Sequence, residues 1–289
     1  MRFRPQSKRF IFSHAIIIIM PEKKKRLDIA LHEQRLAQSR ERARSLIMAG
    51  KVLVNDRIQD KPGFLVAKED SLALKETDIP FVSRGGIKLE AALTAFSINV
   101  NERICLDVGA STGGFTDCLL KHGARKVFAV DVGYGQLAWT LRQDPKVVPV
   151  ERTNIRYMPS EVITSPVDFV TIDVSFISLK IVVPAILKFM KNNAGIIALI
   201  KPQFEVGKGR VGKGGVVKDT LLHKEVIKNL SDFFSEAGLN IEGVIDSPIL
   251  GPKGNKEFFI YMKLDALVKS RKSIIFLSNH EEREAENII

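Results

Sequence analysis

Four apolar segments of the chain each end in a polar residue that could bind a ligand or carry a proton, and a fifth segment is followed by such a residue a few positions later. The residues are Asp107, Asp131, Asn154, Asp173 and Lys201. If the segments are parallel strands of one sheet, their carboxyl ends meet at one edge, which is where such sheets bind ligands. A carboxylate at Asp131 could then accept hydrogen bonds from both hydroxyls of a ribose, and the Asn154 amide could read an adenine edge. A lone acidic residue at a strand end is often only a helix cap, but the repetition favours a ligand site.

The first of these segments runs into a loop rich in glycine, serine and threonine, Asp107-Val-Gly-Ala-Ser-Thr-Gly-Gly-Phe-Thr-Asp117. Its glycines do not match the G-x-G-x-x-G dinucleotide fingerprint, and the chain has no G-x-x-x-x-G-K-[ST] phosphate loop. An apolar strand that runs into such a loop and then opens a helix nevertheless predicts a nucleotide-sized pocket at the end of the first strand. Its candidate binding residues are Asp107, Gly109, Ala110, Ser111, Gly113, Gly114, Phe115, Asp131, Asn154 and Asp173.

Elements that could position these residues follow one another from residue 84 to residue 264. We predict strands at 104–108, 127–132, 147–150, 167–173, 195–200, 241–246 and 257–263, with a helix at 221–237. Strands that alternate with helical patterns indicate a mostly parallel sheet. The predicted class is therefore α/β, a doubly wound, Rossmann-like sheet of seven strands.

A smaller α+β unit precedes the sheet, at residues 20–77, with a linker at 78–83. Leu27 and Leu31 indicate a first helix, and Ser39 is placed to cap a second helix that ends at Gly50. Two short strands, at 52–54 and 57–58, form a hairpin, and Lys61-Pro-Gly63 closes the pattern.

Basic side chains follow this pattern closely. Arg40 and Arg44 lie four positions apart and therefore share one helix face. A helix that carries arginines beside a basic hairpin suits A-form RNA, whose phosphates and shape dominate recognition. The alternative is a solvated surface with no partner. The candidate RNA contacts here are Arg40, Arg44, Lys51 and Arg57.

Charge is unevenly distributed along the chain. The formal net charge is +11, and residues 1–60 contain 14 Lys and Arg against 6 Asp and Glu. A segregated positive end favours a polyanionic partner such as nucleic acid, although it could also serve solubility alone. A second basic segment, Gly207-Lys-Gly-Arg-Val-Gly-Lys-Gly-Gly215, follows Lys201. Its Lys208, Arg210 and Lys213 could close over RNA phosphates, or the segment could be a loop without a role.

Two further residues, Lys88 and Glu257, are each more simply explained as surface or edge-strand charges when taken alone. Together with Asp173 and Lys201 they resemble the Lys-Asp-Lys-Glu tetrad of FtsJ-like RNA ribose 2′-O-methyltransferases. The match is closer to one branch, the TlyA family of ribosomal RNA methyltransferases, whose members have also been labelled haemolysins. The motifs that carry it are the N-terminal unit, the loop at 107–117, Ser83-Arg-Gly-Gly-Ile-Lys-Leu89, Asp131-Val-Gly-Tyr-Gly-Gln-Leu137 and Ile200-Lys-Pro-Gln-Phe-Glu205. The resemblance extends from about Met20 through Lys263.

The resemblance implies a methyltransferase domain at 84–264 that uses S-adenosylmethionine to methylate a ribose, of a cytidine, in ribosomal RNA or ribosomal subunits. A ribose hydroxyl is a poor nucleophile at neutral pH and needs a base or strong polarisation. Lys201 would activate the hydroxyl, Asp173 would orient Lys201, Lys88 would stabilise developing alkoxide charge, and Glu257 would position one lysine. No metal is implied, and the five histidines show no ligand spacing.

The ends of the chain fall outside this pattern. The apolar run at 10–20 follows basic residues and superficially resembles a signal peptide, but His14 interrupts it and it is too short to span a bilayer. We expect residues 1–19 to be a non-structural extension and 265–289 to be a tail. Cys105 and Cys118 fall at core positions, which favours reduced thiols in a cytoplasmic protein.

Two other functions remain as alternatives. One is a non-catalytic RNA-binding factor of ribosome assembly that keeps a cofactor pocket, and a complete tetrad argues against it. The other is a membrane-active haemolysin. The lack of any stretch of about twenty apolar residues argues against it.

Overall fold

A computed structural model describes residues 24–74, 79–207, 209–212 and 214–264. The predictions for residues 1–19 and 265–289 lie outside these ranges. The chain divides into two compact units, Met1–Asp78 and Ile79–Ile289. Each unit is described by itself.

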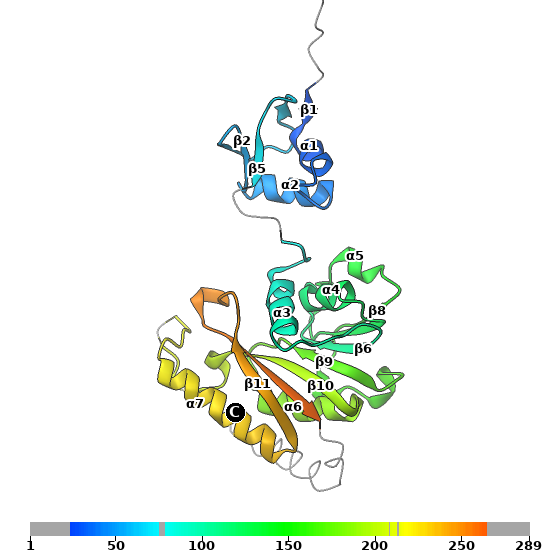
Figure 1. Cartoon of the computed structure of the whole chain (residues 1–289), viewed down its shortest axis with the longest axis vertical. Coiled ribbons are helices and arrows are strands. Elements are labelled where there is room, and N and C mark those ends of the chain that lie inside the picture. The colour runs from blue at the N-terminus through cyan, green and yellow to red at the C-terminus, as the bar shows by residue number, and fades with distance from the viewer. Residues whose placement is uncertain (1–23, 75–78, 208, 213, 265–289) are drawn as a thin grey trace, which may run out of the picture. The chain divides into compact units, whose positions relative to one another are not determined.

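The N-terminal unit has the predicted order of helix, helix and hairpin (Figure 1). Ser39 Oγ accepts a hydrogen bond from Arg42 N at 3.1 Å, which confirms the predicted N-cap. Asn55 and Asp56 form the hairpin turn with positive φ angles of 48° and 60°. The elements are β1 (Lys25–Arg26), α1 (Leu27–Glu33), α2 (Arg40–Met48), β2 (Val52–Val54), β3 (Arg57–Gln59), β4 (Leu65–Val66) and β5 (Leu72–Leu74).

The prediction that Lys61-Pro-Gly63 closes the unit is wrong. β5 pairs antiparallel with β2 to give the order β3-β2-β5, and β4 pairs with β1. Asn55 contributes to this return, because its side chain accepts a hydrogen bond from Ser71 N and donates one to Asp70. The small core includes Leu27, Leu31, Ala43, Ile47 and Val52, all fully buried.

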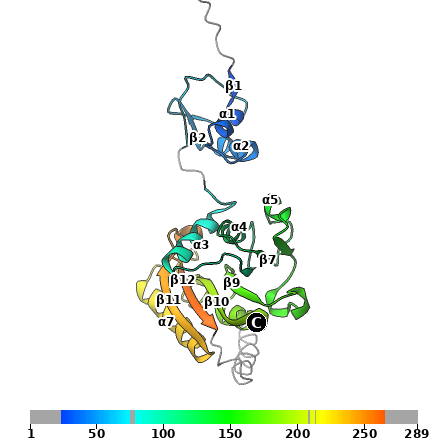
Figure 2. The same cartoon turned by 45° about the vertical axis from the view of Figure 1, so that its right-hand side comes forward.

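The larger unit contains a seven-stranded sheet in the order β11-β12-β10-β9-β6-β7-β8. Neighbouring strands are parallel except β12, which runs antiparallel to both β10 and β11, and Figure 2 shows it between them. The strands are β6 (Ile104–Val108), β7 (Lys126–Val130), β8 (Val147–Val150), β9 (Val167–Ile172), β10 (Met190–Ile200), β11 (Leu239–Asp246) and β12 (Phe258–Leu264). The mostly parallel α/β sheet is therefore confirmed.

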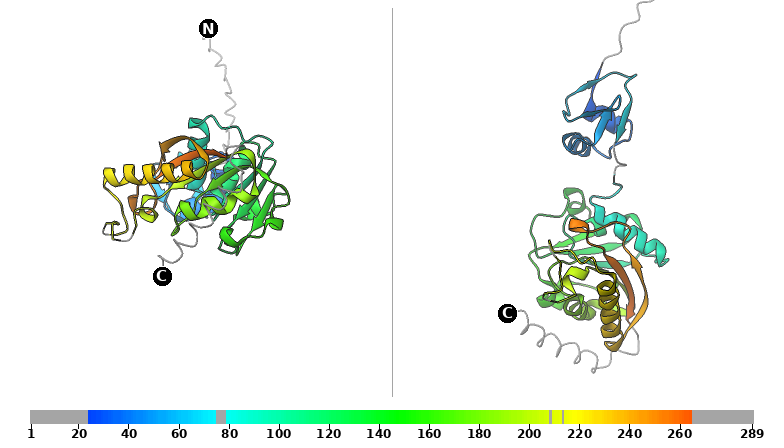
Figure 3. Two further views of the ribbon diagram at one scale, coloured as in Figure 1. Left: turned by 90° about the horizontal axis from the view of Figure 1, so that it is seen from below. Right: turned by 90° about the vertical axis from the view of Figure 1, so that its left-hand side faces the viewer.

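Helices cover both faces of this sheet (Figures 1 and 3). α3 and α4 pack on one face through Leu89, Leu93 and Leu119, while α6 and α7 pack on the other through Val182 and Phe234. The long helices are α3 (Arg84–Ala95), α4 (Gly114–Lys121), α6 (Leu179–Ile186) and α7 (Thr220–Glu236), and a single turn, α5 (Trp139–Arg142), follows β7.

The predicted linker contributes to this core. Phe81 is only 5% exposed and packs among the residues of α3 and α4. A Cβ on Gly86 would lie 2.2 Å from the Phe81 ring, so only glycine leaves room for this contact. Val82 N also donates to Asp117 Oδ2 at 2.8 Å. These contacts fix the start of α3, the helix that carries Lys88.

Candidate active site

A cavity of about 400 Å³ lies at the carboxyl ends of β6 and β9. It is bounded by the loop after β6, the start of α3, and a turn that precedes β12. Its walls are formed by Ser83, Arg84, Gly85, Lys88, Gly109, Ala110, Ser111, Thr112, Gly114, Phe115, Asp173, Leu250, Gly251, Pro252 and Lys253. Seven predicted site residues, namely Lys88, Gly109, Ala110, Ser111, Gly114, Phe115 and Asp173, therefore line one space.

The glycines of the loop after β6 are required by close packing. Gly109 has φ +83°, and a Cβ there would lie 2.4 Å from Asp173 O, so glycine lets the loop approach the end of β9. Gly113 has φ +93° at the start of α4, where a Cβ would meet Leu137 and Leu141. Gly113 thus shapes the loop but does not itself line the cavity.

Lys88 and Glu257 form a buried ion pair, with Nζ 2.5 Å from Oε2. Lys88 comes from the first turns of α3, and Glu257 immediately precedes β12 rather than lying on that strand as predicted. The side chain of Glu257 is fully buried, and its Oε1 has no hydrogen-bond partner among the described residues. Two groups far apart in sequence are therefore brought together as the tetrad requires.

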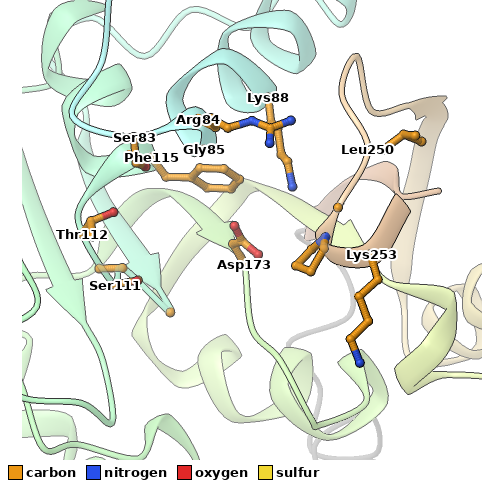
Figure 4. Close-up of a pocket in the computed structure, with 15 residues that line it drawn as sticks. Ser83, Arg84, Gly85, Lys88, Ser111, Thr112, Phe115, Asp173, Leu250 and Lys253 are labelled. Atoms are coloured by element: carbon orange, nitrogen blue, oxygen red, sulfur yellow. The ribbon is translucent and has the colours of Figure 1, made fainter. Parts of the chain in front are cut away.

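Lys201 and Asp173 form the second pair, with Nζ 2.7 Å from Oδ1. Lys201 directly follows β10 and also donates a hydrogen bond to Ser175 Oγ at 3.0 Å. Figure 4 shows Asp173 and Lys88 pointing from opposite sides into the cavity, with Phe115 beside them and Lys253 on the far wall. Each lysine of the predicted tetrad thus has one acidic partner.

Asp131 joins the loops that follow β6 and β7. Its Oδ2 accepts from Ser111 N at 2.8 Å and its Oδ1 accepts from Gly133 N at 2.6 Å. The carboxylate therefore fixes the cavity loop, and its remaining lone pairs stay available to hydroxyl donors.

Asp107 lies beneath the loop and is fully buried, so it does not line the cavity. It accepts hydrogen bonds from Thr116 Oγ1 at 2.7 Å and Thr171 Oγ1 at 3.0 Å. Burial raises the pKa of Asp107 to about 7, against the lowering effect of these two hydroxyls. The structure thus gives Asp107 a supporting position.

Asn154 also lies outside the cavity lining. Its side chain is exposed, and Oδ1 accepts from Arg156 N at 3.1 Å, which caps the short helical turn Ile155–Tyr157. Its predicted contact with an adenine edge stays a prediction.

Sequence reasoning missed the wall formed by Leu250, Gly251, Pro252 and Lys253. The signal was present, because a Gly-Pro pair followed by Lys-Gly marks a tight turn. This turn lies directly before Glu257, and that proximity in sequence could have identified it. The cavity is also lined by Ser83, Arg84, Gly85 and Thr112, for which the sequence pattern predicts no ligand role.

The predicted RNA contacts divide into two groups. Arg40, Arg44 and Arg57 are exposed on the N-terminal unit, and Lys51 is half-buried. Arg210 is instead held by α7, because both of its terminal nitrogens bond Glu225 at 2.6 Å. The carboxylate of Glu225 therefore engages two of the five guanidinium N–H donors and pairs its charge on the surface of the unit. Lys208 and Lys213 lie outside the described residues.

The described residues contain neither a helix that could span a membrane nor a group of side chains that could hold a metal ion. None of their helices combines the length and the apolarity that crossing a membrane requires. Within the same residues, no three His, Cys, Asp or Glu side chains are grouped as a metal site.

The sheet order, the glycine loop at the end of β6 and the two lysine–carboxylate pairs define a class, the methyltransferases of the doubly wound α/β type. Comparison with known families agrees. Residues 81–264 match the FtsJ-like methyltransferase family and residues 25–72 match the S4 domain. The chain belongs to the FtsJ-like methyltransferases and, within them, to the TlyA family.

Individual relatives match more than four fifths of the chain. A 16S/23S rRNA (cytidine-2′-O)-methyltransferase, TlyA of Mycobacterium tuberculosis, is 48% identical over 82% of this chain and 89% of its own. YqxC of Bacillus subtilis, named as a candidate rRNA methyltransferase, is 46% identical over 84% of this chain and 87% of its own. A solved structure of a candidate hemolysin from Streptococcus thermophilus has a TM-score of 0.65 and is 38% identical. The match covers 92% of this chain and 99% of that one.

Proposed function

We propose that the chain transfers a methyl group from S-adenosylmethionine to the 2′-hydroxyl of a cytidine ribose in ribosomal RNA. The observation that carries the proposal is the arrangement of Lys88–Glu257 and Lys201–Asp173 as two ion pairs, with Lys88 and Asp173 both lining one cavity. The substrate class is supported by the TlyA relative, whose name specifies rRNA and cytidine.

The residues present fit S-adenosylmethionine. The cavity volume, about 400 Å³, lies in the range of about 300–1,000 Å³ typical of small-molecule sites. The loop from Gly109 to Phe115 forms one wall without a phosphate-binding motif, which suits a nucleoside that carries no phosphate. Asp131, fixed by Ser111 N and Gly133 N, is the candidate partner for the ribose hydroxyls of the cofactor. When bound, S-adenosylmethionine would supply an activated methyl group on a positively charged sulfur.

The chemistry asked of the protein is to hold and deprotonate one hydroxyl group. The step requires the neutral amine form of Lys201, so the ammonium group of the ion pair first releases a proton to solvent. As the 2′ oxygen then gains the methyl group, its own proton passes to Lys201 Nζ. Asp173 lies 2.7 Å from that nitrogen and stabilises the ammonium group formed. Lys88, held by Glu257, offers positive charge to the developing alkoxide, and a buried cation acts strongly there because little water screens it. In-line transfer then depends chiefly on proximity and alignment.

The N-terminal unit is proposed to dock the RNA. Its match to the S4 domain and its exposed Arg40, Arg44 and Arg57 support this part. Such side chains contact RNA phosphates and recognise the shape of the A-form helix. They therefore position the substrate without selecting the base.

The test is transfer of labelled methyl from S-adenosylmethionine to 30S and 50S subunits and to free rRNA. We expect label in rRNA that survives alkali, because a 2′-O-methyl group blocks cleavage of the adjacent phosphodiester. Lys201→Ala should lose transfer by at least about a hundredfold, the contribution of a general base. It should still bind S-adenosylmethionine.

Lys228→Ala provides the matched control, because Lys228 is an exposed lysine on α7 paired only with Asp232 among the contacts described. Its activity should equal that of the wild type. Absence of alkali-resistant label from every substrate would contradict the proposal and favour a non-catalytic assembly factor.

A further inference from the structure

A buried asparagine, Asn255, lies two residues before Glu257 and is 3% exposed. It belongs to the turn Gly251–Asn255, which forms one wall of the cavity. This turn is closed by hydrogen bonds from Gly251 N to Asn255 O at 2.9 Å and from Gly254 N to Gly251 O at 3.1 Å. The residue is therefore near the tetrad without lining the cavity.

The turn packs directly on Glu257. A Cβ on Gly251 would lie 2.0 Å from Glu257 Oε1, so the glycine backbone forms the surface against which this carboxylate rests. Glu257 in turn holds Lys88 through Oε2. Any shift of the turn therefore changes the space around the Glu257 carboxylate. It also changes the direction from which Glu257 holds Lys88.

The turn does not hold this shape by itself. Lys253 and Gly254 have consecutive positive φ angles of 58° and 82°. The left-handed region is unfavourable for a residue that has a Cβ, so Lys253 needs support from its surroundings.

The Asn255 amide supplies that support through three hydrogen bonds. Nδ2 donates to Pro252 O within the turn at 3.2 Å and to Gly215 O at 3.0 Å, while Oδ1 accepts from Val217 N at 3.1 Å. These contacts need two donors and one acceptor on one short side chain. Among the amino acids, asparagine provides this combination. Aspartate has the same shape but would place an acceptor against two carbonyl oxygens.

The segment that Asn255 binds is itself anchored. Val217 is buried in the core, and its carbonyl accepts a hydrogen bond from His223 Nε2 on α7 at 2.9 Å. The same segment continues the chain from Lys201. Asn255 thus ties the polypeptide that follows Lys201 to the polypeptide that precedes Glu257.

We propose that Asn255 is a positioning residue for the methyl transfer, acting through Glu257 on Lys88. The inference rests on the proposed function, since it assigns Asn255 to the same site. If it holds, replacing Asn255 lowers the rate of the chemical step rather than the affinity for either substrate.

The decisive comparison is Asn255→Asp in two backgrounds. In the wild-type background we expect kcat to fall roughly ten- to a hundredfold, the cost of misplacing a catalytic group by up to about 1 Å. KM for S-adenosylmethionine and for the ribosomal substrate should each change by less than about threefold. In the Glu257→Gln background, where the path to Lys88 is already broken, Asn255→Asp should change kcat by no more than about twofold.

Asn240→Asp is the matched control, because Asn240 is exposed on β11 and the substitution introduces the same negative charge. Thermal unfolding measured on each variant checks that the fold is intact. Equal losses of kcat in both backgrounds, or a loss confined to KM, would overturn the positioning role.

A measurement without turnover separates this inference from the proposed function. The Cε resonance of Lys88, assigned by its loss in Lys88→Arg, should shift in Asn255→Asp and stay in place in Asn240→Asp. A wild-type protein without transfer activity would sink the proposed function, and an unchanged Lys88 resonance would sink the positioning role.

Discussion

Lys88 Nζ lies 2.5 Å from Glu257 Oε2, although the two residues are 169 positions apart in the chain. The pair joins the start of α3 to the approach to β12, and both side chains are nearly excluded from water. Such a pair repays the cost of removing two charges from water only when its geometry is good and its remaining polar atoms are satisfied. Glu257 Oε1 is not satisfied within the described residues. The pair is therefore better explained by what it does at the cavity than by stability.

Removing one partner of this pair should be costly, and removing both should not. Lys88→Met leaves a buried carboxylate unpaired and should lower the free energy of unfolding by about 3–5 kcal/mol. The double variant Lys88→Met/Glu257→Leu should recover most of that loss while showing no methyl transfer. Denaturant unfolding measures the stability of each variant.

The exposed pair Lys228–Asp232 on α7 is the control for this prediction. Lys228→Met should cost less than about 1 kcal/mol, as surface pairs usually do. If Lys88→Met were no more destabilising than Lys228→Met, the pair would not be buried as the structure shows.

The sheet and two residues of the tetrad could be predicted from the sequence because they depend on local pattern. Each strand is an apolar run, and a polar residue directly after it must lie at the carboxyl edge. This pattern places Lys201 and Asp173. The roles of Glu257 and Lys88 follow only from the family resemblance, since nothing local shows that they meet.

Other features depended on contacts between distant segments. Strand β5 is a run of three residues, Leu72–Leu74, too short to identify without its partner β2. The ion pair of Arg210 with Glu225 also joins separate elements, and without it Arg210 has the pattern of a free phosphate ligand. The position of Asp107 beneath the loop also depends on a distant segment, because one of its hydrogen-bond partners, Thr171, lies on the neighbouring strand β9.

Asp107 should make stability depend on pH in the direction opposite to most carboxylates. Its pKa is raised by burial from the model-compound region near 4 to about 7, so between these values the folded state binds more protons than the unfolded state. Stability from this group is therefore fully present below about pH 4 and is lost as pH rises through about 7. The loss should approach about 1.4 kcal/mol per pH unit within that window.

Asp107→Asn removes the ionisation and keeps a side chain that can bond Thr116 and Thr171. Free energies of unfolding measured by denaturant at several pH values give the difference between wild type and variant. We expect that difference to fall steadily from pH 4.5 to pH 7. A difference that stays constant with pH would mean that Asp107 titrates normally.

The N-terminal unit offers a test of local stability at Asp28, whose carboxylate is fully buried on α1. Arg26 Nε donates to Oδ1 at 3.0 Å and Arg40 Nη2 approaches Oδ2 at 3.4 Å, and the hydrogen bond from Arg26 lowers the pKa of Asp28. Hydrogen bonds to a charged group contribute about 1.5–3 kcal/mol each, so Asp28→Ala should loosen both helices. Hydrogen exchange measured by mass spectrometry should accelerate at least tenfold in residues 27–48 and stay unchanged in residues 104–130.

Glu33→Ala is the control, because the pair of Glu33 with Lys25 is exposed and should contribute little. Equal protection in Asp28→Ala and Glu33→Ala would show that the bonds between Asp28 and the two arginines do not stabilise these helices.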